Sequence, residues 1–162
     1  MLHASRPPIR RQSEYEPATD TRVTLSDFRK TLARFRGLPT AERRLIIKTA
    51  VLFKTAHITL RFQPLDRARA SLVRLASRLN ARAGTLSELT WAVKAVNRHL
   101  PGKHSCLINA VSAEAIARHS GLAVDFRLGA ARNGDAMRFH AWLEQEGRII
   151  IGEHEGDFAS FH

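Results

Sequence analysis

Apolar residues recur every three to four positions through much of the chain before residue 100. This spacing places them on one face of an α-helix, and Gly and Pro residues divide the pattern into separate segments. The sequence therefore predicts four consecutive helices. Their expected ranges are about 25–36, 40–63, 65–82 and 85–100.

A fifth helix is predicted to begin at Cys106, the only cysteine of the chain. Ser105 is a typical N-cap residue, and apolar residues follow at helical spacing until Gly121 interrupts the pattern. The unpaired N–H groups and the positive dipole end in the first turn of a helix favour a thiolate and can stabilise an oxyanion. Cys106 is therefore a candidate nucleophile, and a small buried hydrophobic residue is the alternative interpretation.

After residue 121 the apolar period shortens to two. Alternation over residues 122–129 predicts a strand, and an Asn-Gly turn at 133–134 leads into a second strand over 137–144. A turn at 146–147 then begins a third strand, 148–152. The predicted fold class is α+β, with a helical N-terminal half followed by a nucleophile helix packed on a small antiparallel sheet.

His140 lies on the less apolar face of the second predicted strand. A two-residue hairpin loop at 146–147 would place Glu153 directly across from His140, whereas a three-residue loop would place Gly152 there. A thiol at a helix start, an imidazole on a strand and a neighbouring carboxylate provide a nucleophile, its base and the group that orients the base. The sequence thus predicts a Cys-His-acid site.

Length and composition fit a globular protein. The chain has 162 residues, of which 44% are hydrophobic and 25% charged, and this composition excludes general disorder. We expect a flexible tail at 1–22 and a single domain at 23–162, with a helical subregion at 23–100 and a catalytic helix-plus-sheet core at 101–162. A lone cysteine cannot form an internal disulfide and no signal segment is recognisable, so we expect a cytoplasmic protein.

The positive charge is concentrated in the front half of the chain. Residues 1–85 contain 18 Lys/Arg and 6 Asp/Glu, whereas residues 86–162 contain 8 and 9. This asymmetry indicates an acidic partner, nucleic acid or an anionic membrane surface, and a solvated basic helical face is the alternative. Lys48, Lys54 and His57 interrupt the second helix, so no transmembrane segment is expected, although weak contact with a membrane surface is compatible with the pattern.

The order Cys, His, acid is that of papain-like and transglutaminase-like enzymes. Within that group the chain resembles the transglutaminase-like leader peptidases of lasso-peptide biosynthesis, a resemblance that covers roughly residues 25–155. The matching stretches are 41–45 with the apolar helix through 62, the Leu-Pro-Gly and Ser-Cys-Leu block at 100–107, the block at 121–129, and the His-Ala-Trp-Leu-Glu block at 140–147.

The resemblance implies a cysteine peptidase that cuts the leader from a ribosomally made precursor peptide, so that a separate cyclase can close the macrolactam ring. Cys106 would be the nucleophile and His140 the general base. The family usually has an Asp a little over ten residues after the His, whereas this chain has Glu153, with Glu155 as second choice. We expect no cofactor.

The resemblance also implies a leader-recognition domain, either fused or separate. Residues 1–85 lack the strand alternation that a fused domain would show, so the recognition protein is expected to be a separate chain. Trp142, on the same strand face as His140, is a candidate wall of the site, and aromatic packing alone explains it equally well. Asn109, one turn after Cys106, is interpreted as a polar helix residue rather than a catalytic one.

Two other functions remain open at this stage. One is a basic nucleic-acid-binding module, although no recognition motif accompanies the charge. The other is a metal-binding module, although the candidate ligands lack the paired spacing of a structural zinc site. Those ligands are His99, His104, Cys106, His140 and His154.

Overall fold

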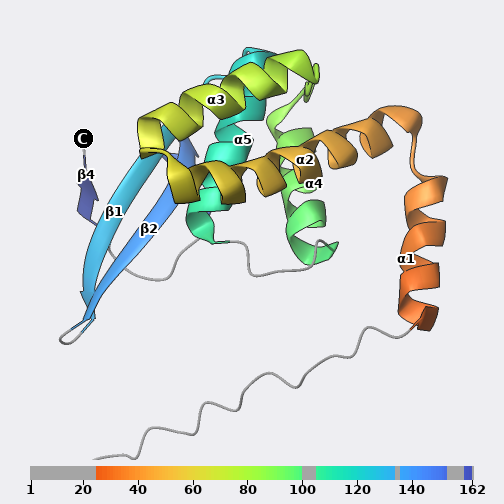
Figure 1. The fold of residues 1–162 in the computed structure, drawn as a ribbon, viewed down its shortest axis with the longest axis horizontal. Coiled ribbons are helices and arrows are strands. Elements are labelled where there is room, and N and C mark those ends of the chain that lie inside the picture. The colour runs from red at the N-terminus through yellow and green to blue at the C-terminus, as the bar shows by residue number, and fades with distance from the viewer. Residues whose placement is uncertain (1–24, 100–104, 134–135, 153–158, 162) are drawn as a thin grey trace, which may run out of the picture. The chain divides into compact units, whose positions relative to one another are not determined.

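The computed structural model describes residues 25–99, 105–133, 136–152 and 159–161 (Figure 1). The elements follow the order α1 (Leu25–Gly37), α2 (Thr40–Phe62), α3 (Leu65–Arg78), α4 (Leu86–His99), α5 (Cys106–Ser120), β1 (Asp125–Asn133), β2 (Ala136–Gln145), β3 (Arg148–Ile151) and β4 (Ala159–Phe161). The chain divides into two compact units, 1–36 and 37–162, and the core and the candidate site belong to the second. The tail expected at 1–22 lies outside the described residues.

The predicted α+β fold class is confirmed.

The ends of α2 are set by two prolines. Pro39 precedes the first turn, and Gln63, which comes directly before Pro64, has the extended angles φ −129° and ψ 147°. A residue before proline is sterically driven out of the helical region, and this stops α2 at Phe62. No helix among the described residues is long and apolar enough to cross a membrane.

The prediction for the end of α3 was wrong by about one turn. The helix ends at Arg78, and Asn80 adopts the left-handed angle φ 48°. The N–H of Ala81 then bonds to the carbonyl of Ala76 at 2.9 Å, which is the hydrogen bond of a left-handed helix end. Ala81 and Ala83 continue the apolar pattern because they are buried in the core, and not because they are helical.

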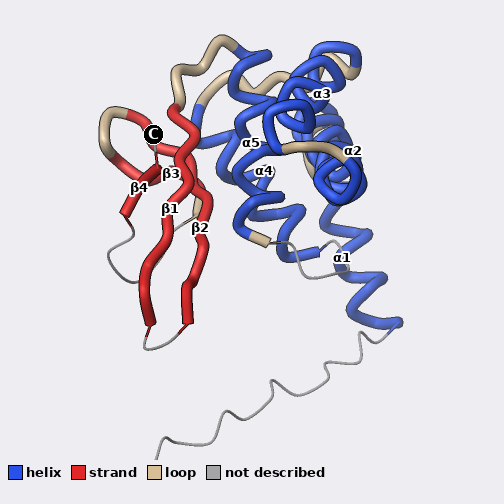
Figure 2. Tube along the Cα trace, turned by 60° about the vertical axis from the view of Figure 1, so that its left-hand side comes forward, coloured by secondary structure: helices blue, strands red, loops and turns tan. Residues whose placement is uncertain are grey.

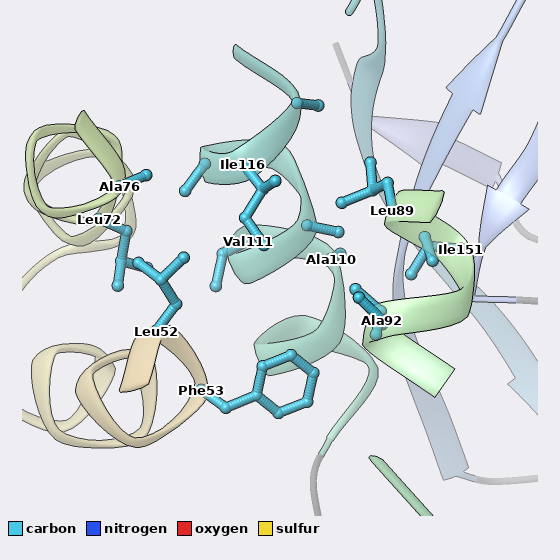
Figure 3. Packing of buried hydrophobic residues seen from close by; sticks show 14 of the residues in the cluster. Leu52, Phe53, Leu72, Ala76, Leu89, Ala92, Ala110, Val111, Ile116 and Ile151 are labelled. Carbon is cyan, nitrogen blue, oxygen red and sulfur yellow. The ribbon is translucent and has the colours of Figure 1, made fainter. Parts of the chain in front are cut away.

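Helix α5 is the centre of the core. Every residue from Ala110 to Ala117 is buried, so this helix is enclosed on all sides. Figure 3 shows α5 with Val111 and Ile116 directed toward α2 and α3, and Ala110 directed toward α4 and β3. The fully buried neighbours include Leu52 and Phe53 of α2, Leu72 and Ala76 of α3, and Leu89 and Ala92 of α4.

The strands form one antiparallel sheet in the order β3-β2-β1-β4, with α5 and α4 packed against it (Figure 2). Strand β1 begins at Asp125, three residues later than the alternation indicated, and extends to Asn133. Strand β4 was not predicted, because three residues are too few to show a period. Residues Ala141, Leu143 and Ile151 face α5 and join its core.

The predicted two-residue turn between β2 and β3 is confirmed. Gln145 pairs with Arg148, and the turn residues Glu146 and Gly147 have φ 50° and 77°, as a tight hairpin turn of this kind requires. A β-bulge follows, so that Glu144 pairs with Ile149 but Leu143 pairs with Ile151. The bulge shifts the pairing by one residue, so the unbroken register on which the expected Glu153–His140 pairing depended does not continue to Ile151, and Glu153 itself lies outside the described residues.

Candidate active site

The candidate nucleophile Cys106 is the first residue of α5. Ser105 has extended angles, φ −66° and ψ 158°, and its side-chain oxygen accepts a hydrogen bond from the N–H of Ile108 at 3.3 Å. Ser105 is therefore the predicted N-cap, and the helix begins at Cys106. The Cys106 side chain is half-buried and packs against the hydrophobic core. A helix start leaves its first N–H groups without partners in the helix, and these can donate to an oxyanion.

The candidate base His140 lies on β2, half-buried. Its Nε2 atom is 2.8 Å from the carbonyl oxygen of Gly152, and its ring stacks on that of Trp142 with the centroids 6.0 Å apart and an angle of 20° between the planes. Trp142 was a candidate wall of the site with aromatic packing as the alternative, and the stacking fits both interpretations. Only 4% of Trp142 is exposed, so one side of the imidazole is shielded from water.

Trp142 is itself held by a charged pair. Its indole N–H donates to Glu144 Oε1 at 2.6 Å, and Arg127 Nε of the neighbouring strand donates to Glu144 Oε2 at 3.3 Å. The carboxylate therefore receives one hydrogen bond on each oxygen, and the indole has a fixed orientation. Glu144 was not predicted as a site residue, although its position two residues after Trp142 on the same strand face was a usable signal.

The structure brings the helix of Cys106 against the strand of His140. Ala141 and Leu143 of β2 pack into the core around α5, and His140 alternates with them, so its side chain lies on the opposite face of the strand. Among the described residues, no hydrogen bond joins Cys106 Sγ to the His140 ring. The two candidate catalytic groups thus belong to packed neighbouring elements without a formed thiol–imidazole contact.

Asn109 lies one turn after Cys106 on α5. Its Oδ1 atom is buried and has no hydrogen-bond partner, and the same holds for Oγ of Ser112 farther along the helix. A buried unsatisfied acceptor typically costs ~1–3 kcal/mol. The assignment of Asn109 as a polar helix residue stays a prediction.

The predicted acid and two of the predicted metal ligands fall outside the description. Glu153, Glu155, His104 and His154 lie among residues whose placement is not described. Within the described part of the chain, no group of three His, Cys, Asp or Glu side chains is arranged to hold a metal ion.

A cavity of about 320 Å³ lies between α3 and α5, lined by Asp66, Arg69, Ala70, Val73, Glu114 and Arg118. The carboxylate of Glu114 already accepts hydrogen bonds from Arg69 and forms an ion pair with Arg118. The charged groups of this cavity therefore satisfy one another, and we interpret them as a structural cluster that joins the two helices.

Comparison with known proteins agrees with the fold. The family model of the transglutaminase-like superfamily matches residues 49–162, which is more than half of the chain and includes Cys106 and His140. No curated protein and no solved structure matches the chain significantly.

Proposed function

Because the chain belongs to the transglutaminase-like superfamily, which typically has cysteine protease or transglutaminase activity, we propose that it is a cysteine peptidase that removes the leader from a ribosomally synthesised lasso precursor peptide. The observation that carries the peptidase chemistry is the position of Cys106, at the capped start of a buried helix that packs on the strand of His140. The resemblance of the four sequence blocks supports the finer assignment to leader removal.

In the proposed mechanism, His140 takes the thiol proton of Cys106 and the thiolate attacks the scissile carbonyl. Backbone N–H groups at the start of α5, including that of Cys106, stabilise the tetrahedral oxyanion. His140 then protonates the leaving amine, and water hydrolyses the acyl-enzyme. The described residues form no Cys106–His140 hydrogen bond, and His140 lies on the face of β2 opposite to the residues that pack on α5, so the mechanism requires the two groups to approach each other when substrate binds.

We propose Glu153 as the acid that orients His140, with Glu155 as second choice. The hydrogen bond between His140 Nε2 and Gly152 supports this proposal, because it brings the chain directly before Glu153 beside the imidazole. A carboxylate there would stabilise the imidazolium that forms when His140 accepts a proton.

The proposed partners are the precursor, a separate leader-recognition protein and a macrolactam cyclase, all acting in the cytoplasm, where a thiol stays reduced. The exposed face of α2 supports docking of an acidic recognition protein. Its large apolar side chains recur at helical spacing and are exposed to 54% at Ile47, 40% at Val51, 59% at Ile58 and 76% at Phe62. Exposed Arg44 and Arg61 lie on the same helix, so the surface combines apolar and cationic groups that complement an acidic amphipathic surface.

The test takes a short precursor reading frame and a recognition protein sought in the gene neighbourhood, and follows leader release by mass spectrometry. The purified chain, with that recognition protein, should cut the precursor at one junction. Cys106→Ala should abolish cleavage and leave the far-ultraviolet circular dichroism unchanged. An intact precursor after incubation with the wild-type proteins, or cleavage by Cys106→Ala within about tenfold of wild type, would reject the proposal.

A further inference from the structure

His140 is held in one orientation by a main-chain carbonyl. Its Nε2 atom lies 2.8 Å from the oxygen of Gly152, and a carbonyl oxygen only accepts hydrogen bonds. Nε2 is therefore the nitrogen that carries the proton, and in the neutral ring the lone pair lies on Nδ1. We infer that the carbonyl of Gly152 is a positioning group, which fixes the tautomer of His140 so that Nδ1 is the basic nitrogen.

The local backbone explains why a glycine stands at this position. Gly152 has φ 88°, a left-handed conformation that other residues adopt only with strain. A Cβ atom there would lie 2.7 Å from the carbonyl oxygen of Ala141 and 3.0 Å from Cβ of Trp142. The backbone of Gly152 can therefore approach β2 closely only because the residue has no side chain.

The β-bulge directs this carbonyl. The extra residue of β3, Ile150, shifts the pairing just before β3 ends, and such bulges bend a strand and re-aim the residues that follow. Gly152 comes directly after the last residue of β3. The end of the strand is thereby turned toward the face of β2 that carries His140.

Trp142 restricts the ring from the other direction. Its indole is stacked on the imidazole and is anchored by the hydrogen bond to Glu144, which Arg127 in turn holds. The hydrogen bond fixes the direction of Nε2, and the stack fixes the plane of the ring. Together these contacts give His140 a defined tautomer and orientation, which a general base requires.

This inference rests on the proposed function only for the role of His140 as the base. The family resemblance assigns the orienting role to a carboxylate, whereas the geometry assigns the bond to Nε2 to a backbone group. If both act, the carbonyl sets the tautomer before substrate binds, and the acid stabilises the charged ring during the reaction.

The test is nuclear magnetic resonance of the full-length, ¹⁵N-labelled protein under conditions where its histidines are neutral. The ring of His140 should show one Nε2–H tautomer, with a ring N–H proton protected from exchange with water and with cross-relaxation to the α-protons of Gly152. A rapidly exchanging ring proton or a mixture of tautomers would overturn the inference. This readout does not require activity, so it distinguishes failure of the inference from failure of the proposed peptidase function.

Two matched variants connect the contact to the glycine. Gly152→Ala should remove the protected proton, because the new Cβ cannot fit against Ala141. Gly147→Ala is the control, since Gly147 also has a left-handed φ, 77°, but a Cβ there meets no atom within 4 Å. If the protected proton persists in Gly152→Ala, or is lost equally in both variants, the glycine backbone does not have the assigned role. If Gly152→Ala does not fold, the measurement on the wild-type protein decides alone.

Discussion

Arg69 of α3 and Glu114 of α5 form a two-pronged hydrogen-bonded ion pair, with Nε to Oε2 at 2.8 Å and a terminal guanidinium nitrogen to Oε1 at 2.6 Å. The Glu114 side chain is only 2% exposed, and Arg118 bonds to the same carboxylate at 2.9 Å. The guanidinium of Arg69 also lies 4.3 Å from the centre of the Phe126 ring on β1. This cluster therefore joins α3, α5 and strand β1 of the sheet.

Removal of the buried charge should destabilise the fold. Glu114→Gln leaves two guanidinium groups without their anion, and breaking a buried pair typically costs on the order of 3 kcal/mol. Urea denaturation measures the change in the free energy of unfolding. The control is Asp66→Asn, because Asp66 pairs with Arg69 at 3.5 Å but is 94% exposed, and an exposed pair contributes only ~0–1 kcal/mol. Equal losses in the two variants would contradict the structural role of Glu114.

The pH dependence of this pair follows from its arginine. The hydrogen bond to Glu114 raises the pKa of Arg69 above its ordinary value. A raised pKa means that the stabilisation is fully present below the ordinary pKa of the group and is lost only as pH rises through the pKa of the folded state. For arginine that window lies above pH ~12, so alkaline conditions up to about pH 10 should not weaken the pair.

In Arg69→Lys, the pH range in which the ion pair loses its stabilising effect becomes low enough to measure. Lysine has an ordinary pKa of ~10.4 and cannot form the two parallel hydrogen bonds of a guanidinium. The variant should be less stable than wild type by a constant amount between about pH 7 and 9, and the difference should widen above about pH 10.4. Urea titrations at several pH values test this expectation. A difference that narrows as pH rises would show that the charge of residue 69 does not stabilise the fold.

The ion pair illustrates what the sequence could and could not predict. Glu114 was visible as the only acidic residue of a largely apolar helix, but nothing marked Arg69, 45 positions earlier, among the many arginines of the front half. The helices were predictable because apolar spacing and Gly or Pro boundaries are local signals. The cysteine at the start of α5 was predictable for the same reason, through Ser105.

The features that the sequence did not reveal depend on tertiary contacts. The three consecutive isoleucines of β3 show no alternation, so they cannot specify which residue is the bulge, and the register was misassigned there. The carbonyl of Gly152 has no signature in the sequence, because any residue carries the same group. Its use at His140 follows only from the approach of two strands.

The cap at Ser105 provides a test of how the nucleophile is presented. Ser105→Ala removes the hydrogen bond to the N–H of Ile108 and should cost ~1 kcal/mol of stability, whereas Ser105→Asn retains a capping oxygen and should cost little. Thermal or urea unfolding measures both. If the two variants are equally stable, the side chain of Ser105 does not cap α5 in solution.

If the exposed face of α2 binds the separate recognition protein, substitutions on this face should weaken precursor cleavage that depends on that protein. Phe62→Ser with Ile58→Ser removes the two most exposed apolar side chains of that face and should raise the KM for the precursor in the presence of the recognition protein. The turnover rate should change little. The rate of the isolated chain, which should be slow at low peptide concentration, should be unaffected.

Met137→Ser is the control for this experiment, since Met137 is 55% exposed but lies on β2. The wild type, the α2 double variant and Met137→Ser are compared by steady-state kinetics at a limiting concentration of the recognition protein. An unchanged KM in the α2 variant would exclude this face as the docking surface. Full activity of the isolated chain at low peptide concentration would show instead that leader recognition is built into the chain itself.

The last prediction concerns the acid of the proposed site. If Glu153 orients His140, Glu153→Gln should preserve the fold but lose the charge that stabilises the imidazolium, and the turnover rate should fall by up to ~10⁴-fold while peptide binding changes little. Glu155→Gln should change the rate little, because in this proposal Glu153, and not Glu155, orients the imidazole. Leader-cleavage kinetics on the two variants measure the difference.

The hydrogen bond from His140 to Gly152 makes the opposite outcomes informative. Loss of activity in Glu155→Gln alone would place the acid two residues farther along the chain. Retention of activity in both variants would show that neither Glu153 nor Glu155 is needed to orient the ring, as expected if the carbonyl of Gly152 fixes it. In that case the pair Cys106–His140 carries the reaction, and the tautomer measured for His140 in the Glu153→Gln protein should equal that of wild type. A changed tautomer in that variant would instead assign the orienting role to the carboxylate and not to the backbone.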